Sequence, residues 1–324
     1  MANRGSISAK RYRSLAMMGT APTVPEIDGT NMNSAFVLGA TAYATNGANI
    51  SSFDGSLWTG LGNGPQPSVS GYETTAACAL TATQGFFIQG YNDSGFNVGA
   101  SNAAKSVDYT YISWHGQALN GSGPKSFGLP TAHSGDLTYN LAGNGTGVYA
   151  KNRRVFSING IVYGAFGYQG SSGPISPARY TDTLYSFSAS TNDWTYKQTL
   201  GSSSVKNGVV AVVGATAYFF NSSYGTKYNP TTNTFSSAAS FTSSMAGGPI
   251  WSGSTNIYCV ERNKIWQYTV ASNSWSQIRS YISMSASAFS FGFVLGTWSY
   301  VNGSYLGGPY GIDTIYVTYK IDVN

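Results

Sequence analysis

Charged side chains are scarce in this chain of 324 residues. They make up 9% of the sequence, whereas an average soluble domain has about a quarter. Aromatic residues, in contrast, reach 15% and include 24 tyrosines, a composition that argues for packed strands and against disorder. We therefore expect a folded protein whose surface is wetted mainly by Ser, Thr, Asn, Gly and Tyr.

Residues suited to metal or nucleophilic chemistry are also few. The two cysteines, Cys78 and Cys259, lie in apolar, strand-like stretches without Cys-x-x-Cys spacing, which favours buried free thiols over a disulfide or a metal site. The two histidines, His115 and His133, flank a stretch rich in Gly, Ser, Asn and Pro; they are either solvated loop residues or a functional pair. No motif selects a carboxylate pair for glycoside hydrolysis. We predict a protein that is not an enzyme, with no catalytic, metal or cofactor site.

Long apolar runs are missing as well. No stretch approaches the roughly 18 apolar residues of a membrane-spanning helix. The apolar patch at residues 15–18 is too short for the core of a signal peptide. The sequence thus predicts a protein made in the cytoplasm without a secretory signal and without a membrane span.

Positive charge is concentrated at the N-terminus. The net charge is +5, no acid precedes Glu26, and the chain after residue 13 is nearly neutral. This basic segment is an anchor that docks on another protein, a tail without a role, or a nucleic-acid contact. Nucleic acid is disfavoured, because so few charges give only weak, salt-sensitive binding to phosphate. The predicted anchor residues are Arg4, Lys10, Arg11 and Arg13.

An aromatic signature returns at a near-fixed interval in the second half of the chain. In each copy, two aromatic residues lie seven positions apart, and an Asn precedes the second by two positions. The second aromatics step by 41 and then 40 residues. An interval of this length with strand-like flanks indicates the blades of a β-propeller. The pairs are Phe187 with Trp194, Tyr228 with Phe235, and Tyr268 with Trp275.

Each signature predicts a hairpin whose aromatics pack between neighbouring blades. Six glycine-led strand pairs along the chain predict an all-β propeller of six four-stranded antiparallel blades. Seven is the alternative, because residues 115–145 could hide a degenerate unit. The chain ends before a fourth strand of the last unit can form, so an N-terminal segment or a neighbouring subunit should supply it, and we favour a segment within residues 20–33. We therefore divide the chain into a basic arm with a possible closing strand (1–33) and the propeller (34–324).

The stretch 155–283 resembles the Kelch family of propellers. Residues 159–167, 183–187 and 192–194 follow the Kelch order of strand, glycine, Tyr and Trp, although the expected glycine pair is reduced to Gly164 and Gly167. Near the N-terminus, residues 52–58 nearly match the Ser-x-Asp-x-Gly-x-x-Trp box of sialidase-type propellers, with one residue missing. These resemblances imply a propeller but leave the function open, because Kelch propellers serve as enzymes, adaptors and virion parts.

Two function classes follow. A low-charge surface without a secretory signal is typical of a virion protein released by lysis, such as a bacteriophage tail or capsid appendage. Such a protein would dock by its N-terminal arm and present propeller loops to other subunits or to a host receptor or glycan. The alternative is a carbohydrate-binding or glycan-hydrolysing propeller. Acids and arginines clustered at one mouth of the channel would favour the alternative.

Overall fold

In the computed structural model, 24 strands and their short turns are described. The residues predicted to hide a seventh unit, 115–145, fall almost entirely outside the described residues. The described residues are 20–24, 32, 34–45, 49–63, 72–79, 84–91, 104–108, 126–127, 154–169, 179–188, 193–200, 209–221, 224–241, 249–261, 264–280, 286–307 and 313–321.

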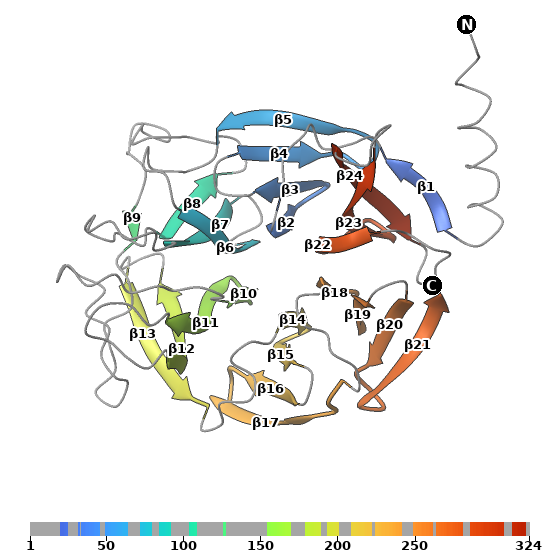
Figure 1. Ribbon diagram of the computed structural model, residues 1–324. Coiled ribbons are helices and arrows are strands. Elements are labelled where there is room, and N and C mark those ends of the chain that lie inside the picture. Colours follow the sequence, from blue (N-terminus) through green and yellow to red (C-terminus); the bar gives the residue numbers. More distant parts are fainter. Residues whose placement is uncertain are drawn as a thin grey trace, which may run out of the picture.

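The strands form four-stranded antiparallel sheets arranged around a ring (Figure 1). The pairing gives six such sheets, numbered here along the chain. Sheet 1 contains β2 (Ser34–Leu38), β3 (Thr41–Thr45), β4 (Asn49–Phe53) and β5 (Trp58–Asn63); sheet 2 contains β6 (Tyr72–Ala79), β7 (Gln84–Tyr91), β8 (Ala104–Asp108) and β9 (Ser126–Phe127); sheet 3 contains β10 (Arg154–Ile158), β11 (Ile161–Gln169), β12 (Arg179–Ser188) and β13 (Asp193–Thr199).

The second half of the ring is built in the same way. Sheet 4 contains β14 (Val209–Val213), β15 (Thr216–Phe220), β16 (Gly225–Asn229) and β17 (Thr234–Ala238); sheet 5 contains β18 (Ile250–Ser252), β19 (Asn256–Glu261), β20 (Lys264–Thr269) and β21 (Ser274–Ser280); sheet 6 contains β22 (Ala286–Leu295), β23 (Trp298–Gly307), β24 (Asp313–Ile321) and β1 (Thr20–Val24). The prediction of an all-β propeller with four-stranded antiparallel blades is confirmed.

The side chains of sheet 2 are described at only a few positions.

The N-terminal strand completes the last sheet. β1 pairs antiparallel with β24, with Thr20 opposite Ile321 and Val24 opposite Thr318. Its position lies within the range, residues 20–33, in which the sequence places a closing strand. The last described pair between the two strands is Val24 with Thr318.

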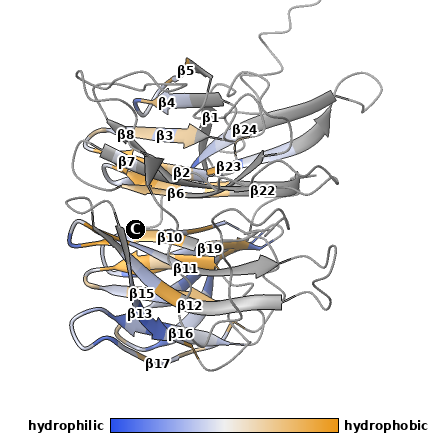
Figure 2. Ribbon diagram, turned by 90° about the vertical axis from the view of Figure 1, so that its left-hand side faces the viewer, coloured by the Kyte–Doolittle hydropathy of each residue, from blue (hydrophilic) through white to orange (hydrophobic). Residues whose placement is uncertain are grey.

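The connections between strands divide the ring into two faces. Because the strands are antiparallel, turns that join the first strand to the second and the third to the fourth leave on one face, called here the turn face. Connections that join the second strand to the third, and one sheet to the next, leave on the opposite face, called here the loop face. On the turn face the described connections span two to four residues, and Figure 2 shows them in colour, gathered on its left-hand side. The connection between β8 and β9 is longer.

The tightest turns on the turn face explain the glycines that lead each unit. Gly39, Gly214 and Gly296 have φ values of 58°, 58° and 61° at the first position of two-residue turns. Such turns match the twist of the flanking strands, and the left-handed backbone favours residues without a Cβ. The equivalent turn in sheet 3 places Asn159 at φ 52° and Gly160 at φ 76°, the Asn-Gly form of the same hairpin.

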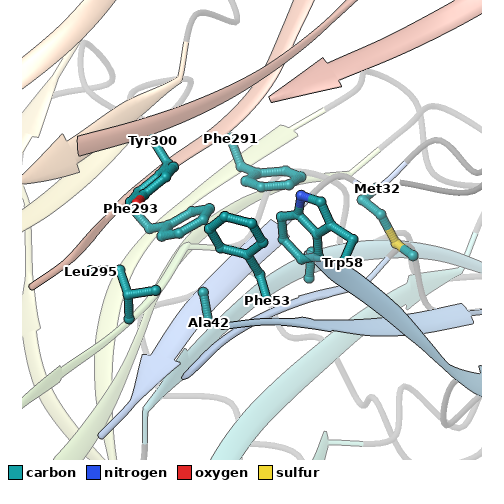
Figure 3. Packing of buried hydrophobic residues seen from close by; sticks show 9 residues of the cluster. Met32, Ala42, Phe53, Trp58, Phe291, Phe293, Leu295 and Tyr300 are labelled. Atoms are coloured by element: carbon teal, nitrogen blue, oxygen red, sulfur yellow. The ribbon is translucent and has the colours of Figure 1, made fainter. Parts of the chain in front are cut away.

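Neighbouring sheets pack face to face through aromatic residues. Between sheets 1 and 6, the Phe53 ring stacks on Trp58 at 4.8 Å and meets Tyr300 edge-on at 5.1 Å between ring centroids. The Trp58 indole N–H donates to Thr318 Oγ1 at 3.0 Å, so the polar end of this buried side chain is satisfied. Figure 3 shows this cluster, whose labelled members are Met32, Ala42, Phe53, Trp58, Phe291, Phe293, Leu295 and Tyr300.

Glycine makes room for a large ring at another contact between sheets. A Cβ at Gly292 in sheet 6 would lie 2.5 Å from Cε3 of Trp251 in sheet 5. The Trp251 indole N–H also donates to Ser299 Oγ in sheet 6 at 2.9 Å. The ring is therefore held from two sides and cannot move away from an added methyl group without losing that hydrogen bond.

We expect Gly292→Ala to destabilise the protein by about 1–3 kcal/mol, the usual cost of overpacking. Gly60→Ala is the matched control, because nothing lies within 4 Å of a Cβ at that position. It should leave the stability unchanged or raise it slightly. Urea denaturation of the two variants measures the difference; equal stabilities would show that Trp251 shifts freely.

Candidate assembly site at the repeated hairpins and the closing strand

The signature aromatics occupy equivalent places in their sheets. Tyr228 lies opposite Phe235, Tyr268 opposite Trp275, and Phe187 opposite Trp194, in each case between the third and the fourth strand. A further pair, Phe53 opposite Trp58, holds the same place in sheet 1. The sequence pattern did not include this pair, because Phe53 and Trp58 lie five positions apart instead of seven.

The two aromatics of each pair differ in burial. Tyr228 and Tyr268 have exposed fractions of 0% and 1%, whereas Phe235 and Trp275 are only partly buried. The side chains of Phe187 and Trp194 lie outside the described residues. The signature predicts the same role for both aromatics, but in these two described pairs the first one is the deeper anchor between sheets.

The Asn of the signature ties its hairpin to the preceding sheet. Asn233 has φ 52°, a left-handed conformation that Asn tolerates better than most residues. Its Oδ1 accepts a hydrogen bond from Tyr228 Oη at 2.9 Å, and its Nδ2 donates to the Lys197 carbonyl of β13 at 2.8 Å. One amide therefore joins the buried tyrosine of sheet 4 to the outer strand of sheet 3.

Asn273 repeats this arrangement one sheet further on. It has φ 51°, and its Oδ1 accepts from Tyr268 Oη at 2.6 Å and from the backbone N–H of Ala239 at 2.8 Å. Ala239 directly follows β17 of sheet 4. We call Asn233 and Asn273 the Asn clamps, since each links a turn of its own sheet to the outer strand of the sheet before it.

Substitutions at Asn273 should separate the two contributions of a clamp, its side-chain hydrogen bonds and its left-handed backbone conformation. Asn273→Gly keeps the left-handed backbone but removes both hydrogen bonds, and we expect it to cost about 1–3 kcal/mol of unfolding free energy. Asn273→Ala loses the same bonds and adds roughly 1–2 kcal/mol of backbone strain. Chemical denaturation should rank the proteins wild type, Gly variant, Ala variant. An Ala variant as stable as the Gly variant would contradict the role given to the backbone.

The clamped tyrosines are held in their neutral form. Burial raises the pKa of Tyr228 to about 12, with a smaller contribution from the charge of Tyr163. Burial likewise raises the pKa of Tyr268 to about 12, helped by the charge of Tyr218. Each hydroxyl therefore remains a hydrogen-bond donor to its Asn across the neutral pH range.

This shift predicts a loss of stability at high pH. A tyrosine whose folded pKa lies above its unfolded value of about 10 stabilises the fold fully below pH 10 and loses that contribution as the pH rises towards 12. Tyr228→Phe should cost about 1 kcal/mol at pH 8 and make the decline between pH 10 and 12 shallower. Urea titrations at both pH values test this, with the exposed Tyr224→Phe as control; an unchanged decline in Tyr228→Phe would rule out Tyr228 as its source.

The stretch that nearly matches the sialidase box serves as a turn. Asp54 Oδ1 accepts hydrogen bonds from the backbone N–H groups of Ser56 and Leu57 at 2.8 and 2.9 Å, and from Ser56 Oγ at 2.8 Å. The Leu57 N–H makes the largest contribution to lowering the pKa of the Asp54 carboxyl. Its acceptor oxygen is thus engaged in shaping the β4–β5 turn, and it positions Trp58 to enter the core.

Other residues singled out as chemically active are placed as follows. Cys78 and Cys259 are free thiols, as predicted; Cys259 is buried, whereas Cys78 is only partly buried. Burial raises the pKa of the Cys259 thiol. His115 and His133 lie outside the described residues. Within the described ranges, no group of three or more His, Cys, Asp and Glu side chains gathers where it could hold a metal ion.

The predicted anchor residues Arg4, Lys10, Arg11 and Arg13 also lie outside the described residues. The structure does show where the segment that carries them joins the ring. Thr20 begins the outer strand of sheet 6 beside Ile321, at the end of β24. The basic segment therefore enters the ring at the rim of the turn face, next to the point where the last strand ends.

The loop face differs from the turn face in the length of its hairpins. In sheet 4, β15 and β16 have five residues each, whereas β11 and β12 have nine and ten, and β23 and β24 have ten and nine. Four or five extra residues lengthen a strand by about 13–17 Å. Because their turn-face ends are held in register with the ring, the additional length of sheets 3 and 6 extends on the loop face.

Comparison with known proteins agrees with this architecture. No family model and no curated protein matches the chain. Among solved structures it is similar to one described as the structure of YjhT, with a TM-score of 0.67 over 93% of this chain and 97% of that one. The fold is a β-propeller. At 12% sequence identity the likeness shows the fold alone, and a Kelch relationship is not shown.

Many solved structures are similar to this chain, so the fold by itself does not identify a function. In all, 706 chains of solved structures match, and one fold commonly hosts many functions. Within the part of the chain that is described, no helix is long and apolar enough to cross a membrane.

Proposed function

We propose that this chain is a non-enzymatic structural or attachment protein of a virus particle, such as a bacteriophage tail or capsid appendage. In this proposal its six sheets form the blades of one Kelch-like ring. The observation that supports it is the pairing of Thr20 with Ile321. This contact fixes the basic segment to the turn face, while the longest hairpins and the connections between sheets leave on the loop face.

This difference between the two faces suits a protein that docks on an assembly through its turn face and binds a receptor or another subunit through its loop face. Residues 1–19 could reach about 60 Å if fully extended from Thr20. A docked segment must recover the entropy lost on ordering, which its four basic side chains can do through ion pairs and hydrogen bonds with an acidic groove. The loops opposite sit on a rigid scaffold, where binding sites commonly occur.

The low charge of the chain supports a role among neutral, hydrogen-bonding partners. Hydroxyl groups are abundant on the described turn face, including the Thr232–Thr234 and Ser272–Ser274 pairs with oxygen atoms 2.7 Å apart. Beyond the basic segment the chain is nearly neutral, so long-range attraction to a partner must come mainly from that segment. Docking through it should therefore weaken as salt increases.

Two truncations test the docking segment. Deleting residues 1–19 leaves β1 intact, so the protein should keep its melting transition but fail to join particles when it is supplied in trans to a strain that lacks the gene. Deleting residues 1–24 removes β1 as well and should lower the melting temperature. Mass spectrometry of purified particles measures incorporation, and calorimetry measures stability.

A charge variant separates the effect of the basic side chains on docking from the effect of the length of the segment. Replacing Arg4, Lys10, Arg11 and Arg13 with Gln should reduce incorporation as much as the deletion of 1–19, without a change in melting. Full incorporation of the deletion variant would overturn the docking role. Absence of the wild-type protein from particles of its source would overturn the proposal as a whole.

A further inference from the structure

Asn302 is a buried polar residue at the contact between sheets 6 and 1. It lies in β23, opposite Phe291 of β22 and Thr318 of β24, and its exposed fraction is 1%. Residues directly opposite each other in antiparallel strands project to the same face of a sheet. Phe291 and Thr318 both contact Trp58 of sheet 1, by ring packing (Figure 3) and by a hydrogen bond. Asn302 therefore faces sheet 1 as well.

Only one end of the Asn302 amide has a partner among the described residues. Its Nδ2 donates to Thr318 Oγ1 at 3.2 Å, whereas the buried Oδ1 has no hydrogen-bond partner. Turning the amide by half a rotation would let the Thr318 hydroxyl donate to Oδ1, but it would leave Nδ2 without a partner. In either orientation one polar atom of the amide is buried, and such an atom is costly unless a further group bonds to it.

A second buried polar side chain, that of Ser51 in sheet 1, faces the same contact. Ser51 is buried and lies opposite Ala44 in the pairing of β3 with β4. Ala44 belongs to the cluster between sheets 1 and 6. Phe53, another member of that cluster, is two positions after Ser51 and so on the same face of β4. Ser51 therefore projects towards sheet 6.

The directions of the strands place Ser51 and Asn302 at the same height in this contact. Phe53 meets Tyr300 edge-on at 5.1 Å between ring centroids. Counted away from the turn face, Ser51 is two residues beyond Phe53 in β4, and Asn302 is two residues beyond Tyr300 in β23. Both strands thus advance by about 7 Å from the same ring contact. Packed sheets lie about 10 Å apart, a distance that Ser and Asn side chains are too short to span alone.

We propose that Asn302 and Ser51 hold one buried water molecule, which links sheet 6 to sheet 1 where the ring closes. Water fits because it both donates and accepts hydrogen bonds, so it satisfies Asn302 in either orientation of the amide. Buried waters make roughly two to four hydrogen bonds to groups that lack other partners. A β-bulge offers a further one. The register of β22 and β23 shifts between Phe289 and Phe291, so the backbone of Ser290 has no residue opposite it.

This water extends a chain of hydrogen bonds that already crosses the contact. Thr318 Oγ1 accepts from the Trp58 indole N–H at 3.0 Å and from Asn302 Nδ2 at 3.2 Å. With the water, the chain runs from Trp58 through Thr318 and Asn302 back to Ser51, and so joins the two sheets at two points. Buried networks whose members are all satisfied hold a core in one arrangement. The water therefore helps to fix how sheet 6 is aligned on sheet 1.

A crystal structure of the full chain tests the site directly. We expect an ordered water within hydrogen-bond distance of both the Asn302 amide and Ser51 Oγ. A direct hydrogen bond between the two side chains, or the lack of water density between them, would overturn the proposal.

Paired substitutions test the bridge in solution. Asn302→Leu replaces the amide with an apolar group of similar shape, and Ser51→Ala removes the hydroxyl. In the wild type, Ser51→Ala should raise the unfolding equilibrium constant roughly two- to tenfold, the usual effect of losing one hydrogen bond. In the Asn302→Leu protein, which no longer holds the water, it should have no further effect.

Ser186→Ala is the matched control for this pair. Ser186 is also a buried serine, but it lies in β12 of sheet 3, so its substitution should have the same effect with and without Asn302→Leu. Urea denaturation measures each protein. Effects of Ser51→Ala and Asn302→Leu that simply add would overturn the proposal. If Asn302→Leu does not fold, the crystal structure of the wild type decides the question.

Discussion

The structure depends on the burial of each sheet against its two neighbours. A four-stranded sheet leaves apolar side chains on both faces, and only a ring covers both faces of every sheet. The contact between sheets 1 and 6, with Phe53, Trp58 and Tyr300 at its centre, closes this ring. The clamps at Asn233 and Asn273 add polar links between consecutive sheets at the turn face.

Much of the fold could be predicted from the sequence because the repeat reflects a physical requirement that every unit of the ring must meet. Each unit must turn between its third and fourth strands and bury an aromatic there, so Tyr228 with Phe235 and Tyr268 with Trp275 were recognisable from spacing alone. The same reasoning located the closing strand. The clamps were not predictable, because their partners in the preceding sheet, the Lys197 carbonyl and the Ala239 N–H, are backbone groups that any sequence provides. The closer spacing of Phe53 and Trp58 in the sequence also hid their equivalence.

The candidate site was less accessible to sequence reasoning than the fold. The basic residues near the N-terminus mark a segment with unusual charge, but their role stays a prediction. What the structure adds is the point of attachment, since β1 fixes that segment to the rim of the turn face. The lengths of the strands identify a second surface, formed on the loop face by the long hairpins of sheets 3 and 6.

The position of β1 also has a consequence for how the protein is made. β1 (Thr20–Val24) pairs with β24 (Asp313–Ile321), so β1 must wait without its partner while the residues between the two strands are synthesised. At about 5–20 residues per second, that interval lasts some tens of seconds. Sheets 1 to 5 contain only consecutive strands and can form in order during that time. The ring itself closes only after β24 has been synthesised, in a single long-range step of the kind that slows folding. A chain that stops short of β24 therefore has no strand for β1 to join.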